Sequence, residues 1–242
     1  MLRIRLQMPK GESVEFVHQD VLHDSLIHAI TATGISSEVI LGRNAEAWTF
    51  APLGWAGNNK RRVHTLVVST SSLKISEALR QLRPENVRYA RALTGEMVDF
   101  SGATIIEESD VIPPGGGTLG TLMLSPLLIS QRGTKPKIWE NDLKNVDLSS
   151  AVNHVLSRCS GREVRLNVQA DSLFLRANPD HAVMVNLKGR PNQRSSFVIG
   201  MSAPLVLSGS EEDLRLAWYA GIGEKTHNGF GSLGLAEEGV GR

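Results

Sequence analysis

The residues with the clearest chemical potential lie near the C-terminus, in the segment AGIGEKTHNGFGS at positions 220–232. Two Gly-x-Gly pairs bracket five polar or charged residues, among them Lys225 and His227. Glycine reaches positive φ without steric cost, so main-chain N–H groups in such a loop can face outward. Backbone N–H groups beside a lysine can cradle a phosphate. The alternative is a glycine-rich connector between a helix and the last strand.

Two nucleotide-binding motifs are similar to this segment, and both fail. The Gly-Glu-Lys-Thr run resembles a P-loop, but Glu224 interrupts the Gly-Lys-[Ser/Thr] core. Thr226 occupies the third glycine position of the dinucleotide fingerprint, and the loop is expected to follow a helix instead of a strand. We therefore expect any phosphate held here to belong to a different kind of ligand.

The composition excludes several classes of protein and of binding site. A net charge of +1 over 242 residues gives no bulk attraction for a polyanion, so a nucleic-acid surface must be a local patch. Cys159, the one cysteine, excludes an internal disulfide and a cysteine-rich metal site. No run approaches the 18 apolar residues of a membrane span, and residues 1–7 alternate like a strand instead of a signal peptide. We expect a cytoplasmic protein with no membrane contact and no cofactor.

The elements that must position the chemical residues follow a β-α-β-β-α-β order in the first half. Strands are predicted at 2–7, 48–53, 63–69 and 98–107, with a further strand-like run at 37–41, and helices at about 21–33 and 73–82. His23 lies within or beside the apolar stripe of the first helix, and His28 points away from it. This order is the ferredoxin-like arrangement.

The run PPGGG at 113–117 is the best internal break, and the pattern resumes after it. Strands are predicted at 118–129, 163–168, 182–188, 196–201 and 230–235, and helices at 143–156 and from Ser208 or Ser210 through Tyr219. The sequence therefore predicts an α+β fold of two tandem ferredoxin-like (RRM-like) domains. They cover residues 1–112 and 118–242, and the second carries the glycine-rich loop at 221–231.

At this point the chain resembles a known family over nearly its whole length. The segment GIGEKT, two residues, then GFG at 221–231 is similar to the C-terminal glycine-rich loop of the CRISPR precursor-RNA processing endoribonucleases. These belong to a superfamily of repeat-associated RNA-binding proteins. Weaker similarities lie in AWTFAPL at 47–53, LSPL at 124–127 and the predicted helix at 208–221.

The resemblance implies binding of the repeat hairpin of precursor CRISPR RNA (crRNA) and its cleavage without a metal. In this family the ribose 2′-hydroxyl attacks the adjacent phosphate, which gives a 2′,3′-cyclic phosphate and a 5′-hydroxyl. The crRNA often stays bound, and other CRISPR effector-complex subunits are candidate partners. The alternative is a non-catalytic crRNA-binding subunit of an effector complex, because one fold serves several functions.

The reaction needs a base, an acid and cations beside the phosphate, and histidine suits the proton transfers. The family's usual histidine lies in the first helix or the loop after it, and residues 41–46 contain none. Two histidine candidates therefore remain in the first helix. His28 is preferred as the catalytic residue, because residues 26–30 resemble the helix context of some members, and His23 is second. A site without histidine that uses Arg43 stays open. So does the ordinary interpretation of each histidine as a surface or packing residue.

RNA contacts are expected from the glycine-rich loop and from three cationic clusters. Double-stranded RNA is read mainly through its shape and phosphates, which suits scattered cations. Each cluster could equally be a set of solvated charges. The predicted RNA-binding residues are Gly221, Gly223, Lys225, His227 and Gly229 of the loop, with Lys60, Arg61, Arg132, Lys188, Arg190 and Arg194 outside it.

Overall fold

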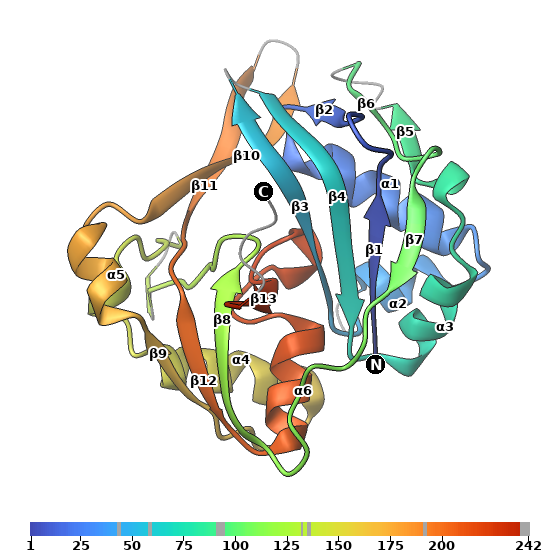
Figure 1. Ribbon diagram of the computed structural model, residues 1–242. Coiled ribbons are helices and arrows are strands. Elements are labelled where there is room, and N and C mark those ends of the chain that lie inside the picture. Colours follow the sequence, from blue (N-terminus) through green and yellow to red (C-terminus); the bar gives the residue numbers. More distant parts are fainter. Residues whose placement is uncertain are drawn as a thin grey trace.

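The first half of the chain folds into an antiparallel sheet with helices on one face (Figure 1). The computed structural model describes residues 1–42, 45–57, 60–90, 95–131, 133–134, 137–190 and 193–237. Strands β1 (Leu2–Gln7), β3 (Trp48–Gly57), β4 (Lys60–Thr70) and β7 (Thr104–Glu107) pair in the order β3-β4-β1-β7. Together with the crossover helices α1 (Gln19–Thr31) and α3 (Leu73–Gln81), this is the predicted ferredoxin-like order.

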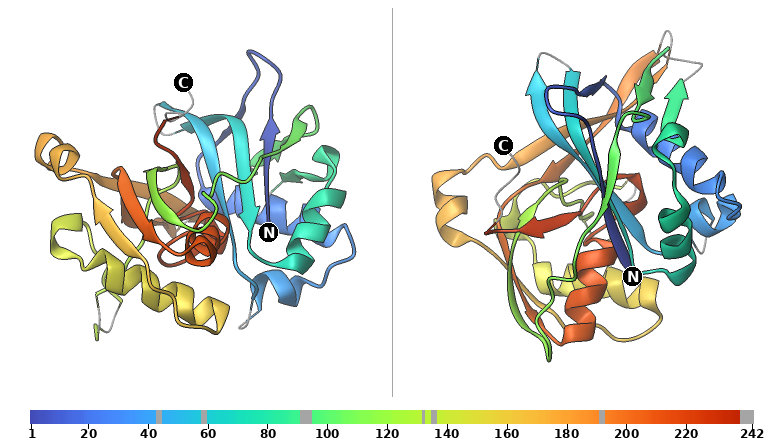
Figure 2. Two further views of the ribbon diagram at one scale, coloured as in Figure 1. Left: turned by 60° about the horizontal axis from the view of Figure 1, so that its bottom comes forward. Right: turned by 45° about the vertical axis from the view of Figure 1, so that its right-hand side comes forward.

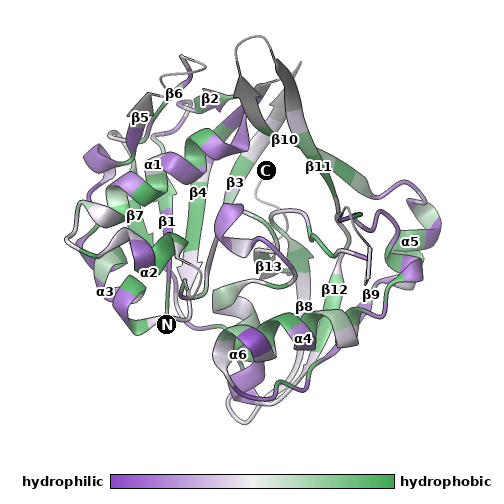
Figure 3. Cartoon of the chain, turned by 180° about the vertical axis from the view of Figure 1, so that it is seen from behind, coloured by the Kyte–Doolittle hydropathy of each residue, from purple (hydrophilic) through white to green (hydrophobic). Residues whose placement is uncertain are grey.

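Short elements complete this first domain. Strand β2 (Val14–Phe16) pairs with β4 beyond the end of β1, and β5 (Arg88–Ala90) pairs with β6 (Met97–Asp99). Helix α2 (Ser37–Leu41) follows α1, and the single turn η1 (Pro84–Asn86) follows α3. Figure 3 shows hydrophilic and hydrophobic residues alternating along α1, α2 and α3. That pattern is typical of helices that cover one face of a sheet.

The second half repeats the same topology with an insertion. Strands β8 (Gly117–Met123), β9 (Asn167–Ala170), β12 (Leu205–Gly209) and β13 (Leu233–Leu235) pair in the order β13-β8-β12-β9. The helices α4 (Leu148–Ser160) and α6 (Glu211–Ala220) are the crossovers. The remaining elements are η2 (Leu143–Asn145), α5 (Ser172–Ala177), the hairpin of β10 (Ala182–Arg190) and β11 (Gln193–Met201), and η3 (Thr226–Asn228).

The two tandem ferredoxin-like units confirm the predicted fold class, but several strand predictions were wrong. Residues 37–41 form the helix α2, because Ser36 caps it by accepting a hydrogen bond from the Glu38 N–H. A turn at residues 101–102 divides the predicted strand 98–107 into β6 and β7. Strand β12 was not predicted, and the segments 182–188 and 196–201 form a separate hairpin instead of joining the four-stranded sheet.

Helix α6 is the element that joins the domains, because it packs against β3 and β4 of the first sheet (Figure 2). The face of that sheet opposite α1 and α3 carries Thr49, Ala51 and Val67, which are fully buried. Ala51 and Val67 pack with Leu124 of the second domain. The first sheet is therefore covered on both faces, once by its own helices and once by the second domain.

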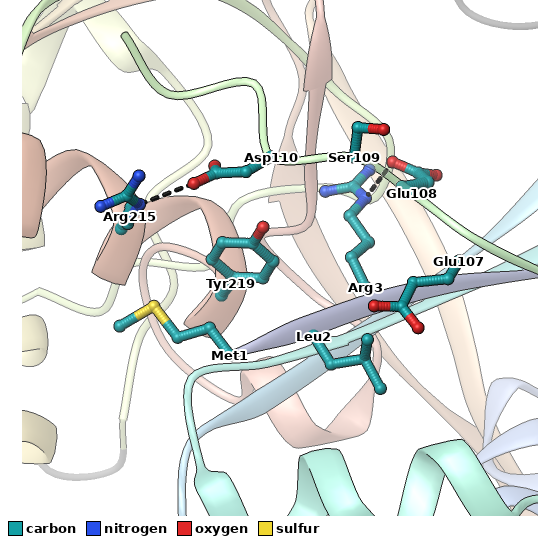
Figure 4. Close-up of a pocket in the computed structure, with 9 residues that line it drawn as sticks. All are labelled: Met1, Leu2, Arg3, Glu107, Glu108, Ser109, Asp110, Arg215 and Tyr219. Atoms are coloured by element: carbon teal, nitrogen blue, oxygen red, sulfur yellow. Dashed lines mark hydrogen bonds and ion pairs between the residues drawn. The ribbon is translucent and has the colours of Figure 1, made fainter. Parts of the chain in front are cut away.

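A buried arginine sits at this junction (Figure 4). The side chain of Arg3 on β1 is 1% exposed, and its Nε lies 2.9 Å from Glu108 Oε2. Its guanidinium carbon lies 4.3 Å from the ring centroid of Trp218 on α6. Nearby, Arg215 Nε donates to Asp110 Oδ2 over 2.7 Å, and burial, helped by Asp110, raises the pKa of Tyr219 to about 12. Charged groups of β1, the interdomain segment and α6 thus lie side by side at this junction, with Arg3 buried and the Arg215–Asp110 pair partly exposed.

Helix α6 begins where the sequence predicts. Ser210 Oγ accepts a hydrogen bond from the Asp213 N–H at 3.2 Å, and Glu211, Glu212 and Asp213 occupy the first turn. We expect Ser210→Ala to lower the free energy of unfolding by about 1 kcal/mol, because it removes the cap acceptor. Urea denaturation measures the change. Ser13→Ala, an exposed serine in the loop before β2, is the control and should be neutral. Equal stabilities for the two variants would contradict the prediction.

Candidate active site

The glycine-rich loop directly after α6 is closed by its own backbone. The Ile222 N–H donates to the Gly231 carbonyl at 2.9 Å, so the two ends of the loop meet. The Gly231 N–H donates to the Pro126 carbonyl at 2.9 Å, and the Glu224 N–H to the Leu128 carbonyl at 2.8 Å. These N–H groups fix the loop to the second domain and do not face outward. The outward-facing cradle expected from the sequence is therefore smaller than predicted.

The first domain holds the same loop from the other side. Gln19 Nε2 on α1 donates to the Gly229 carbonyl at 2.8 Å, and Thr49 Oγ1 on β3 donates to the Phe230 carbonyl at 2.9 Å. Gly229 has a φ of +82°, and a Cβ there would lie 2.6 Å from the Phe50 ring. The loop is thus fixed by both domains, and glycine is required where it passes β3.

A cavity of about 640 Å³ opens beside the loop. Three segments enclose it: the stretch between α2 and β3, the C-terminal half of α4, and the loop itself. The cavity contains the cations Arg158 and Lys225, the carboxylates Glu46 and Glu224, and His227. The remaining lining residues are Gly42, Ala45, Ala47, Trp48, Val155, Leu156, Cys159, Ala220, Gly221, Gly223 and Thr226.

Two histidines from different domains meet at this cavity. The ring centroids of His23 on α1 and His227 in the loop lie 6.3 Å apart. His23 stacks on its other side against Trp48, with centroids 6.2 Å apart and an interplanar angle of 12°. The His23 side chain is 12% exposed. Trp48 is fully buried.

The electrostatics of the loop differ from residue to residue. Burial lowers the pKa of His227, and the charges of His23 and Lys225 lower it further. Burial works to raise the pKa of Glu224, but hydrogen bonds from Lys137 and Ser130 outweigh it and the net shift is downward. The Lys225 ammonium lies 5.1 Å from the ring centroid of Trp139, within cation–π range. At neutral pH the site therefore combines a neutral imidazole with fixed cations.

The structure separates the three catalytic candidates. His28 is exposed, with Nδ1 3.5 Å from the Asn86 carbonyl, and it does not line the cavity. His23, the second candidate for the catalytic residue, is the first-helix histidine that lies beside the glycine-rich loop. Arg43 lies outside the described residues.

The predicted RNA-binding residues fall into two groups. Gly221, Gly223, Lys225 and His227 line the cavity, and Gly229 lies where the loop meets β3. The other cations belong to hairpins: Lys60 and Arg61 begin β4, where burial lowers the pKa of Arg61, and Lys188, Arg190 and Arg194 lie at the ends of β10 and β11. Nothing is described of the side chains of Lys60, Lys188, Arg190 and Arg194, and Arg132 lies outside the described residues.

Figure 1 and the right-hand view of Figure 2 show β3 and β4 running toward the same end of the molecule as β10 and β11. The hairpin β10–β11 is anchored through Val185 and Val198, which pack with Leu128 and with Phe230 of the glycine loop. The two cationic hairpins and the loop thus belong to one connected region.

Three residues that position the loop carried no signal in the sequence. Gln19 and Thr49 hold it through side-chain hydrogen bonds, and Glu224 accepts from the Ser130 N–H at 3.0 Å and pairs with Lys137. The hydrogen bonds Gln19–Gly229, Thr49–Phe230 and Ser130–Glu224 join residues that are 94 or more positions apart in the chain. Only the packing of the two domains identifies Gln19 and Thr49, and only the fold of the second domain identifies Glu224.

The described residues contain neither a candidate membrane span nor a candidate metal site. No helix in the described ranges is both long and apolar enough to cross a bilayer. Within the same ranges, no group of three or more His, Cys, Asp or Glu side chains is arranged to hold a metal ion.

Two ferredoxin-like domains with a glycine-rich loop fixed at their junction define an α+β protein of the class predicted from the sequence. Residues 116–235 match the model of the C-terminal region of the CRISPR-associated protein Cas6. This match over the C-terminal part of the chain confirms the resemblance to the CRISPR-associated Cas6 family noted in the sequence. No curated protein matches it in sequence.

Solved structures share the fold over the whole chain. A Cas6-related protein from Pyrococcus furiosus aligns with a TM-score of 0.71 at 15% identity, covering 98% of this chain and 99% of its own. A RAMP protein described as binding different RNA substrates gives a TM-score of 0.65 at 17% identity, with 97% and 99% covered. A Cas6 product complex gives 0.55 at 13% identity, with 97% and 98% covered.

Proposed function

We propose that this protein is a CRISPR RNA maturation endoribonuclease that binds the repeat hairpin of precursor crRNA and cleaves it. The observation that carries the proposal is the cavity beside the glycine-rich loop, where His227, next to His23 of α1, lies with Lys225 and Arg158. A pair of imidazoles can move protons at neutral pH, and fixed cations can neutralise charge that grows on a phosphate. The match to the Cas6 family model and the likeness to a Cas6 product complex support this assignment.

The proposed reaction is attack of the ribose 2′-hydroxyl on the adjacent phosphate, which needs no metal. The products are a 2′,3′-cyclic phosphate and a 5′-hydroxyl, and the crRNA stays bound through its repeat hairpin. We place the proton transfer at His227, which lines the cavity with the His23 ring centroid 6.3 Å from its own, and not at His28, which is exposed outside the cavity lining. Lys225 and Arg158 would neutralise the phosphate, because both line the same cavity as His227.

The RNA is proposed to extend from the cavity along the two hairpins. Lys60 and Arg61 begin β4, and Lys188, Arg190 and Arg194 lie at the ends of β10 and β11. Phosphate contacts of this kind position a duplex without reading its sequence. We propose domain limits of 1–112 and 118–242, so that the RNA crosses both domains in the cytoplasm.

A non-catalytic crRNA-binding subunit is the second candidate, favoured by the lack of a histidine in the described residues between α2 and β3. One assay separates the two functions. Purified protein is incubated with its cognate repeat RNA in excess EDTA. The nuclease gives one cut at the base of the hairpin and a cyclic-phosphate end. Tight binding without a cut would identify the binding subunit, and a cut only when Mg²⁺ is present would overturn the metal-independent reaction.

Lys225→Ala tests the phosphate contact of the loop. We expect weaker RNA binding and a salt dependence of log K shallower by about 0.7–0.9, because one phosphate contact is lost. Fluorescence anisotropy with an uncleavable 2′-deoxy substrate, measured at several salt concentrations, gives the slope. Lys144→Ala, an exposed lysine outside the cavity lining, is the matched control and should leave the slope unchanged. An unchanged slope for Lys225→Ala would remove Lys225 from the interface.

A further inference from the structure

We propose that His227 of the glycine-rich loop is the group that accepts the 2′-hydroxyl proton, and that His23 of α1 acts only through it, as a positioning residue. The proposal rests on the proposed ribonuclease function and assigns the proton transfer within it. It reverses the expectation from the sequence, which places the catalytic histidine in the first helix and gives His227 an RNA-contact role.

Access to the cavity separates the two histidines. His227 lines the cavity together with its neighbours Lys225 and Thr226. His23 does not, and its Nε2 is buried with no hydrogen-bond partner among the described residues. The Nδ1 of His23 lies 3.2 Å from Asp24 Oδ1, on its own helix. A ribose in the cavity therefore meets His227 first, and His23 lies behind it.

The backbone around His227 is fixed on both sides. Lys225 is the one non-glycine residue in the described ranges with positive φ, at +55°, and Gly229 ends the short turn at +82°. The Asn228 N–H donates to the Lys225 carbonyl and the Gly229 N–H to the Thr226 carbonyl, each at 2.9 Å. A residue with a side chain is strained at positive φ, and such residues cluster at functional sites. Here it turns the chain so that His227 stands at the cavity.

Packing holds the ring from behind. Trp48, which is fully buried, stacks on His23, and the His23 ring meets the His227 ring at an interplanar angle of 53°. Gln19, one helical turn before His23, donates to the Gly229 carbonyl and fixes the end of the same turn. Helix α1 therefore positions the loop histidine through two side chains. This gives His23 a role without contact with the RNA.

The charges that face His227 come from every element around it. They are Lys225 and Glu224 on the loop, His23 on α1 with Asp24 beside it, Arg158 on α4, and Glu46 before β3, which is paired with Lys74. Burial, followed by His23 and Lys225, lowers the pKa of His227. A lowered pKa leaves the imidazole neutral at neutral pH, which is the form that accepts a proton.

The chemical step is balanced without a metal. The 2′-oxygen forms a bond to phosphorus while its proton moves to the His227 imidazole. The bond from phosphorus to the 5′ oxygen breaks, and a solvent water protonates that oxygen. The imidazolium then returns its proton to solvent. Lys225 and Arg158, as cavity-lining cations, face the phosphate through the step.

The test is the pH dependence of single-turnover cleavage, with saturating protein, for wild type, His227→Gln and His23→Gln. We expect His227→Gln to be slower by about 10²–10⁴-fold and to lose the acid limb of the profile, because no group at this position titrates. His23→Gln should be slower by only about tenfold or less. Its acid limb should move to higher pH, because removing the His23 charge raises the pKa of His227. A merely structural role of His23 would lower the rate without moving the limb.

Controls make each outcome decisive. His154→Gln, an exposed histidine of α4 outside the cavity lining, should match wild type. Both test variants should bind a 2′-deoxy substrate within about threefold of wild type, and His227→Asn repeats the test if the glutamine variant unfolds. Near-normal cleavage by His227→Gln, or loss of the acid limb in His23→Gln, would overturn the assignment alone. Wild-type protein that binds RNA without cutting it would overturn the ribonuclease function itself.

Discussion

Gly231→Ala is expected to lower the free energy of unfolding by about 4 kcal/mol or more, which places it among the severe single substitutions. A Cβ at position 231 would lie 1.8 Å from the Ile222 carbonyl oxygen, a distance that no side-chain movement can relieve. The backbone segments at Ile222 and Gly231 would have to move apart, and the hydrogen bond from the Ile222 N–H to the Gly231 carbonyl would be lost. Chemical denaturation measures the loss, and RNA cleavage at fixed temperature reports the collapse of the site.

Gly161→Ala is the matched control for this substitution. Gly161 caps α4 with a φ of +70°, against +69° for Gly231, and no heavy atom lies within 4 Å of the added Cβ. Its cost is therefore the backbone strain alone, about 1–2 kcal/mol. The difference between the two variants isolates the close approach inside the loop. Equal losses would mean that the loop opens without penalty and does not hold its two ends together.

The repetitive parts of the fold could be predicted because their signals are local. Ser72 and Ser210 cap their helices through the Ile75 and Asp213 N–H groups, as an acceptor before an amphipathic run predicts. The glycine pairs predicted a tight loop, and all four of these glycines have positive φ. Local chemistry was sufficient for these features.

The sequence could not show which segments pair or pack with one another in the fold. The segments 196–201 and 205–209 have the same strand character, and only pairing with β8 and β9 places the second in the main sheet. Likewise, the position of His28 away from the apolar stripe favoured it as the catalytic candidate. His23 is the histidine near the loop, because α1 packs at the domain junction. A site between two domains depends on contacts across some 200 positions, which no local pattern contains.

Arg3→Ala is the other substitution with a large expected effect, about 2–4 kcal/mol of unfolding free energy. Glu108 is only 14% exposed and also pairs with Arg5, so the substitution removes one of the two cationic partners of a largely buried carboxylate. The substitution also empties the space beside Trp218 and removes its cation–π contact. Arg165→Ala, which breaks an exposed ion pair with Glu163, is the matched control and should stay close to wild type.

The same junction connects stability to the active site. Arg3 ties β1 to α6, and the glycine-rich loop leaves the last residue of α6, where the Gly221 N–H bonds to the Ala217 carbonyl. A shift of α6 against the first sheet would therefore move His227 away from His23. We expect Arg3→Ala to lose cleavage at temperatures below its unfolding midpoint. Arg3→Met combined with Glu108→Gln should recover part of the stability, since an uncharged pair replaces the buried charges and Arg5 is partly exposed to solvent. A double-mutant cycle without coupling between positions 3 and 108 would show that the pair does not hold the domains together.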